Sequence, residues 1–265
     1  MSVRTEPAPD RDLFGHAPKG RPDWSHRRGE PRLFAVLWLV YLMSATVVML
    51  AMIGAARALS PSVTRPAATM LMVVCMVGVC VLWPALRLSQ LAPRRAARSV
   101  AADLPVVLVP VCALIVPQGF WFLSDWSWGV VVALCGFFAA WGLVVGALLA
   151  IALGTVGRGD ADAPPGIGRT AWTLGFVVLV VAAPVLVGLG VFGGPEASGV
   201  HAARPGWLFS PVTAVMDLVR DRSAGGVAAR IGVNHARALG YTFVAAGGLW
   251  TVVMVLGLVR SWRDA

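Results

Sequence analysis

Charged residues are scarce in this sequence. They make up 13% of its 265 residues, whereas hydrophobic residues make up 58%. Soluble domains contain about a quarter charged residues, so this composition is typical of a membrane protein. No polar stretch is long enough to form a second domain. We therefore expect one all-α, multi-pass membrane domain at residues 32–265, preceded by a disordered cytoplasmic tail at 1–31.

Lysine is nearly absent as well. Lys19 is the single lysine among 22 basic residues, which we interpret as the arginine bias of a GC-rich bacterial genome. The net charge is +9, but the arginines lie mostly beside hydrophobic runs, where arginine on the cytoplasmic side of a membrane is expected. The basic balance therefore does not indicate nucleic-acid binding.

Signals for catalysis, metals and cofactors are missing. The two histidines of the longest connector, His201 and His235, have no metal-ligand spacing, and no Gly-rich Walker A loop surrounds Lys19. We expect no metal, no cofactor and no enzymatic activity, so any ATP-driven process would need a partner protein. The four cysteines lie inside hydrophobic runs as small apolar residues, without a disulfide framework: Cys75, Cys80, Cys112 and Cys135.

Six hydrophobic runs are long enough to cross a ~30 Å hydrocarbon core as helices. Asp103 is expected to cap the third run, and Pro110 to kink or break it. The runs cover about residues 33–56, 67–86, 103–123, 128–154, 170–192 and 240–259. Residues 193–239 form the one long connector, in which 227–238 is either a separate helix or the start of the sixth span.

Ionisable residues are missing from the interiors of these runs, since Asp103 lies at an edge. Charged groups inside a membrane usually mark ion paths or catalytic sites. Their absence argues against a proton-coupled transporter, a redox or metal-dependent membrane enzyme and an intramembrane protease.

The distribution of arginine and lysine predicts the orientation. With the N-terminus inside, fifteen basic residues fall on the cytoplasmic side and seven on the other side. Five of those seven lie in the long connector, which weakens the bias. We expect both termini to be cytoplasmic, in a bacterial inner membrane.

The long connector contains a helical pattern at residues 210–220. Ser210 is a good N-cap, and Pro211 suits the first helical position. Thr213, Asp217 and Arg220 fall on the face opposite an apolar stripe of valines and Met216. We expect a short amphipathic helix that packs between spans or lies on the outer membrane face, with Asp217 and Arg220 as a local pair.

The fourth run carries small residues at every fourth position. Gly142, Gly146, Ala150 and Gly154 would form a ridge that lets another helix approach closely. Internal packing is the favoured interpretation, and a dimer interface is the alternative.

The order of these features resembles the short, six-span class of bacterial ABC exporter permeases. Ser210-Pro211-Val212-Thr213, followed by Asp217 and Arg220, is similar to a motif that follows the fifth span in that family. The resemblance implies an outer gate formed by Ser210, Pro211, Thr213, Asp217 and Arg220. It also implies a separate ATPase subunit and a second permease copy or paralogue. Arg94, Arg95 and Arg98 would contact that ATPase or anionic lipid.

The function expected from this resemblance is export of a hydrophobic or amphiphilic substrate. The alternative is a non-transporting subunit that anchors or assembles a larger membrane complex, because nothing in the spans demands a conducting path. A channel is disfavoured, since no run presents a repeated polar face.

Overall fold

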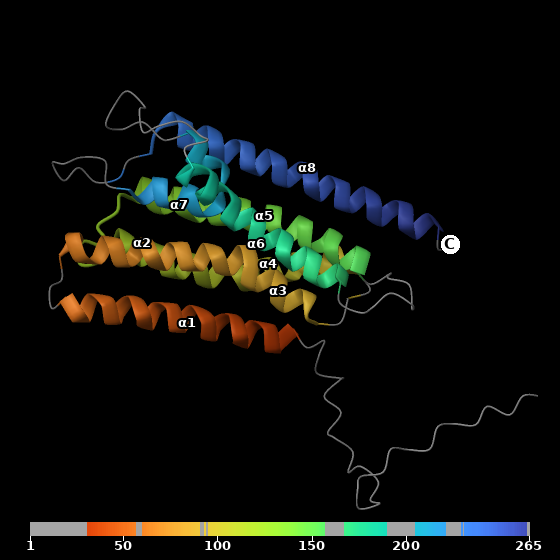
Figure 1. Cartoon of the computed structure of the whole chain (residues 1–265), viewed down its shortest axis with the longest axis horizontal. Coiled ribbons are helices and arrows are strands. Elements are labelled where there is room, and N and C mark those ends of the chain that lie inside the picture. Colours follow the sequence, from red (N-terminus) through yellow and green to blue (C-terminus); the bar gives the residue numbers. More distant parts are fainter. Residues whose placement is uncertain are drawn as a thin grey trace, which may run out of the picture.

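The computed structural model describes residues 31–56, 60–90, 93, 95–156, 167–189, 205–220, 229 and 231–263. Within these ranges the chain is all-helical, and six helices are long and apolar enough to cross a membrane (Figure 1). The predicted fold class is confirmed to this extent, and the six helices indicate a membrane protein. The predicted disordered tail at 1–31 lies outside the described residues except for its last one.

The first three membrane-length segments form one side of the bundle. The first is α1 (Pro31–Ala56). The second is nearly continuous and consists of α2 (Pro61–Val77), the π-helix η2 (Gly78–Leu82) and α3 (Trp83–Leu88). The third consists of α4 (Ala96–Ile115) and the 3-10 helix η3 (Val116–Gly119).

The remaining segments build around α5 (Trp128–Val156), which contacts α4, α6, α7 and α8. α6 (Ile167–Gly188) is followed by the 3-10 turn η4 (Pro205–Phe209) and the short helix α7 (Pro211–Val219). The last helix, α8 (Val233–Arg263), packs mainly along α5 (Figure 1). The described part of 227–238 from Val233 onward therefore belongs to the sixth membrane-length helix.

The side of α5 that carries small residues faces α4. A Cβ on Gly142 would lie 3.0 Å from a methyl group of Leu108, and one on Gly146 would lie 3.4 Å from Val100. Ala150 is buried, and Gly154 is half-buried. At Gly142 and Gly146 the small residues therefore serve close packing within this chain.

α1 closely approaches the second segment at Gly78, where the π-helix begins. A Cβ on Gly78 would lie only 2.5 Å from Cε1 of Tyr41, so no larger residue fits without movement of α1. The Tyr41 hydroxyl donates a 2.7 Å hydrogen bond to the carbonyl of Val74, and the Trp38 indole N–H donates to the carbonyl of Val107 in α4. α1 is thus fixed to both neighbouring segments by the hydrogen bonds of Trp38 and Tyr41 as well as by apolar contact.

The third segment differs from its sequence prediction in two ways. α4 begins at Ala96 after an N-cap at Arg95, so Asp103 lies two turns inside the helix and does not cap it. The helix also continues through Pro105 and Pro110 and changes to 3-10 geometry only at Val116. Of the two outcomes expected at Pro110, a kink or a break, the break is therefore wrong.

Candidate functional site

α7 lies at one end of the bundle and packs between other helices. It contacts α2, α5, α6 and η4, and each of its residues except Met216 is buried. Met216 is 40% exposed, whereas Thr213 and Asp217 are 3% and 0% exposed. The polar face thus points into the protein and an apolar side chain points out. This is the reverse of a helix that rests on a membrane surface with its polar face in water.

The start of α7 matches its sequence signals, but the cap differs. Ser210 has extended backbone angles, and Pro211 occupies the first helical position. The Ser210 hydroxyl makes no capping hydrogen bond, and it is buried without a partner in the part of the chain that the structure describes. Thr213 instead ties α7 to η4, because its hydroxyl donates a 2.6 Å bond to the carbonyl of Trp207.

Asp217 joins α7 to α8. Its Oδ2 lies 3.0 Å from Nε2 of His235, and both side chains are completely buried. Nδ1 of His235 accepts a hydrogen bond of 3.1 Å from the backbone N–H of Gly232, directly before α8. Because Nδ1 accepts, the proton of a neutral imidazole is on Nε2 and is donated to Asp217.

This arrangement has a chemical consequence. A histidine that acts as general base needs a ring nitrogen with a free lone pair directed at a substrate. In His235 one nitrogen is used by Gly232 and the other by Asp217. The pair therefore connects two helices, and its geometry does not match a nucleophile-activating dyad.

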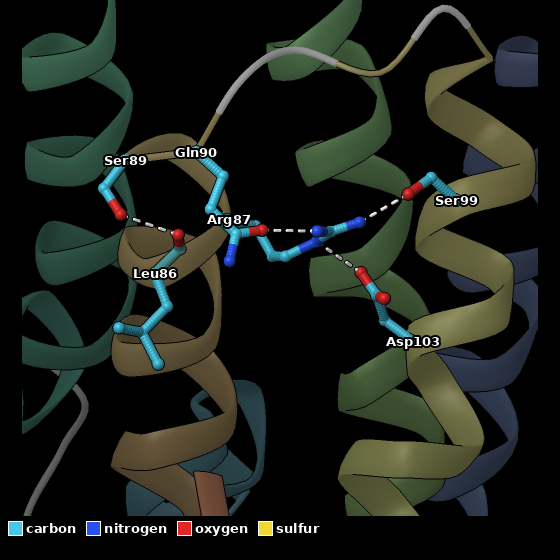
Figure 2. A network of polar contacts seen from close by, with 6 residues as sticks. All are labelled: Leu86, Arg87, Ser89, Gln90, Ser99 and Asp103. Atoms are coloured by element: carbon cyan, nitrogen blue, oxygen red, sulfur yellow. Dashed lines mark hydrogen bonds and ion pairs between the residues drawn. The ribbon is translucent and has the colours of Figure 1, made fainter. Parts of the chain in front are cut away.

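A second buried polar cluster joins α3 and α4 at the opposite end of the bundle from α7. Nε of Arg87 lies 2.6 Å from Oδ2 of Asp103, with side chains 8% and 7% exposed. Figure 2 shows that the guanidinium reaches across from α3 toward α4 and is also bonded by Gln90 and Ser99. It lies 5.9 Å from the centre of the Phe34 ring in α1.

In the Arg87 cluster, both terminal nitrogens of the guanidinium are hydrogen-bonded, and Nε is held by the ion pair with Asp103. Nη1 donates to Oε1 of Gln90 at 2.5 Å, and Nη2 donates to the hydroxyl of Ser99. A buried charge is tolerated only when it is paired and hydrogen-bonded in this way. From the sequence, Asp103 is expected at the edge of a span, whereas it lies inside α4 and is buried against Arg87, near the end of α3.

The other predicted site residues are placed as follows. Arg95 and Arg98 are exposed at the start of α4, next to the Arg87 cluster, whereas Arg94 lies outside the described residues. Arg220 is the C-cap of α7, has extended backbone angles and is half-buried. Asp217 forms an ion pair with His235. His201 lies outside the described residues.

Sequence reasoning missed Arg87 and His235 as partners. The spacing around the turn gives no signal for Arg87 and Asp103, because Arg87 is one residue before the end of α3 and Asp103 is seven residues after the start of α4. No local signal links Asp217 to His235, which are 18 residues apart.

No family model, no curated protein and no solved structure matches this chain.

Proposed function

We propose that this chain is the permease subunit of an ATP-driven, ABC-type exporter for a hydrophobic or amphiphilic substrate, energised by a separate ATPase. The observation that supports the proposal best is the position of α7. This helix is buried at one end of the bundle and joined to α8 by the Asp217–His235 pair.

A gate must touch the elements that move apart. α7 contacts three membrane-length segments and is hydrogen-bonded to a fourth. A shift of α8 would therefore be passed to α7 through Asp217, while Ser210, Pro211, Thr213 and Arg220 shape its ends. We include in the proposal that residues 193–239 form a helical insertion between the fifth and sixth spans, which contains η4 and α7.

The proposed orientation places α7 on the outer side of a bacterial inner membrane and both termini in the cytoplasm. The Arg87 cluster and the exposed Arg95 and Arg98 then lie on the cytoplasmic side. These arginines and Arg94 would contact the ATPase or anionic head groups. A second copy, or a paralogous permease, would complete the transporter.

Co-purification tests whether the chain binds a separate ATPase subunit. The tagged chain is extracted from its native host in a mild detergent, and the proteins that elute with it are identified by mass spectrometry. A stoichiometric soluble protein with a Walker A loop is the expected result. Elution with integral membrane proteins alone would refute the exporter.

Substitutions in α7 test the gate. Asp217→Asn removes the charged acceptor of a buried hydrogen bond worth about 1.5–3 kcal/mol. We expect it to uncouple substrate-stimulated ATP hydrolysis by the purified complex, with membrane insertion unchanged. Met216→Leu is the matched control, since this exposed side chain of the same helix makes no polar contact. Equal hydrolysis by both variants would contradict a gating role for α7.

One observation favours the alternative, a non-transporting anchor or assembly subunit. A shallow apolar groove of about 550 Å³ runs along the outward face of α1, lined by Val36, Leu39, Val40, Met43, Ser44, Val47 and Val48. Such a face suits a neighbouring membrane helix. Loss of complex assembly on Val40→Trp, together with unchanged assembly in Asp217→Asn, would favour the anchor.

A further inference from the structure

Four aromatic rings form one exposed patch on the turn between η3 and α5. Phe120 stacks on Phe122 with ring centres 5.6 Å apart, and it meets Trp128 edge-on at 6.1 Å. Trp121 meets Phe122 edge-on at 5.9 Å. Their exposed fractions are 43% for Phe120, 80% for Trp121, 50% for Phe122 and 55% for Trp128. We call these four residues the aromatic patch.

The turn that carries the patch is held from inside the bundle. The hydroxyl of Thr64 donates a 2.6 Å bond to the carbonyl of Leu123, and Nε of Arg65 donates a 2.9 Å bond to the carbonyl of Ser124. Both donors belong to α2. The Ser124 hydroxyl donates to Oε1 of the buried Gln118. The carbonyls of Leu123 and Ser124 and the Ser124 hydroxyl are thus hydrogen-bonded on the inner side of the turn.

The backbone of the turn also bonds to itself. The N–H groups of Leu123 and Asp125 both donate to the carbonyl of Phe120, and the N–H of Trp126 donates to the carbonyl of Gln118. Asp125 adopts a left-handed conformation with φ of 49°, which aspartate tolerates better than most residues. Trp126, by contrast with the patch, is 1% exposed and fixes the turn to the bundle.

We propose that the aromatic patch inserts into the boundary between head groups and acyl chains of a phospholipid bilayer. Backbone groups that enter lipid must be satisfied within the protein, and the N–H groups of Leu123, Asp125 and Trp126 are. Aromatic rings, and tryptophan above all, favour this boundary. The patch also lies where two membrane-length helices end and begin, at Gly119 and Trp128. This inference does not depend on the proposed export function.

Depth-dependent fluorescence quenching tests the proposal. The full chain is reconstituted into phosphatidylcholine vesicles whose lipids are brominated either near the head group or near the bilayer midplane. The emission of Trp121 is obtained as the difference between the wild type and Trp121→Phe. We expect the lipid brominated near the head group to remove most of this emission and to quench it more than the other lipid does.

The matched control is Trp126→Phe, which reports the buried ring of the same turn. Its emission should be less sensitive to brominated lipid than that of Trp121. If Trp121 is quenched by aqueous acrylamide and by neither brominated lipid, the patch faces water or a soluble partner and the proposal is overturned. Stronger quenching from the midplane would overturn it as well. Trp128→Phe repeats the measurement at a second ring of the patch.

Discussion

The ion pair between Arg87 and Asp103 gives the sharpest prediction about stability. Nε of Arg87 and Oδ2 of Asp103 are 2.6 Å apart. Two unit charges about 4 Å apart attract each other by about 4 kcal/mol at an effective dielectric constant of about 20. The attraction is opposed by the cost of removing both charges from water. Removing either partner alone therefore leaves the other as a buried charge without a counter-charge. Asp103→Leu and Arg87→Met should each lower the free energy of unfolding by about 3–5 kcal/mol.

The double variant, Arg87→Met with Asp103→Leu, should recover most of this loss, because apolar pairs of similar size often replace buried ion pairs without cost. Gln90 and Ser99 are only half-buried, so water can replace Arg87 as their partner. Unfolding is followed by circular dichroism as SDS is titrated into mild-detergent micelles.

The control is Arg98→Met, which removes an exposed charge from the same helix and should change stability by less than about 0.5 kcal/mol. The coupling free energy between the two sites is the change in the free energy of unfolding of the double variant minus the sum of the changes of the two single variants. If the losses of the single variants simply add, the pair is not a buried, mutually dependent unit and this reasoning is wrong.

Two further predictions concern helix contacts and use the same SDS titration. Gly78→Ala should cost about 1–3 kcal/mol, since its Cβ would meet the ring of Tyr41, whereas Gly247→Ala, with no atom within 4 Å of its Cβ, should cost nothing. Equal stability of the two variants would contradict the close approach of α1 and α2. Trp250→Phe should cost about 0.5–1.5 kcal/mol by removing the indole bond to the carbonyl of Leu143, and an unchanged midpoint would show that this bond does not stabilise the contact of α8 with α5.

Hydrophobic runs were sufficient to predict the six membrane-length helices, because a helix in lipid must be apolar along most of its length. The start of α7 was equally predictable, since Ser210 and Pro211 act through local backbone geometry. Local signals of this kind do not depend on the rest of the fold.

The beginning of α4 was not predictable from hydropathy. Its first two turns contain Arg98 and Ser99, which look like a polar loop, and Ser99 becomes part of a helix that bonds to Arg87 of the preceding segment. The inward direction of Asp217 also depends on a distant residue, His235. Polar residues on a short helix predict a surface position unless their buried partners are known.

The π-helix at Gly78–Leu82 has a consequence for the angular position of α3. A turn closed from residue i to i+5, as from Gly78 to Trp83, holds one residue more than an α-helical turn. One residue corresponds to about 100° of rotation around a helix axis. If the same sequence wound as an uninterrupted α-helix, the Arg87 side chain would be rotated away from Asp103 by that angle. Deletion of Val81 should therefore restore a regular helix and keep Arg87 in phase with α4, whereas deletion of both Val81 and Ala85 removes one residue too many and should separate the pair. The SDS midpoints of the two deletions would differ accordingly, and equal midpoints would argue that the wide turn does not set this phase.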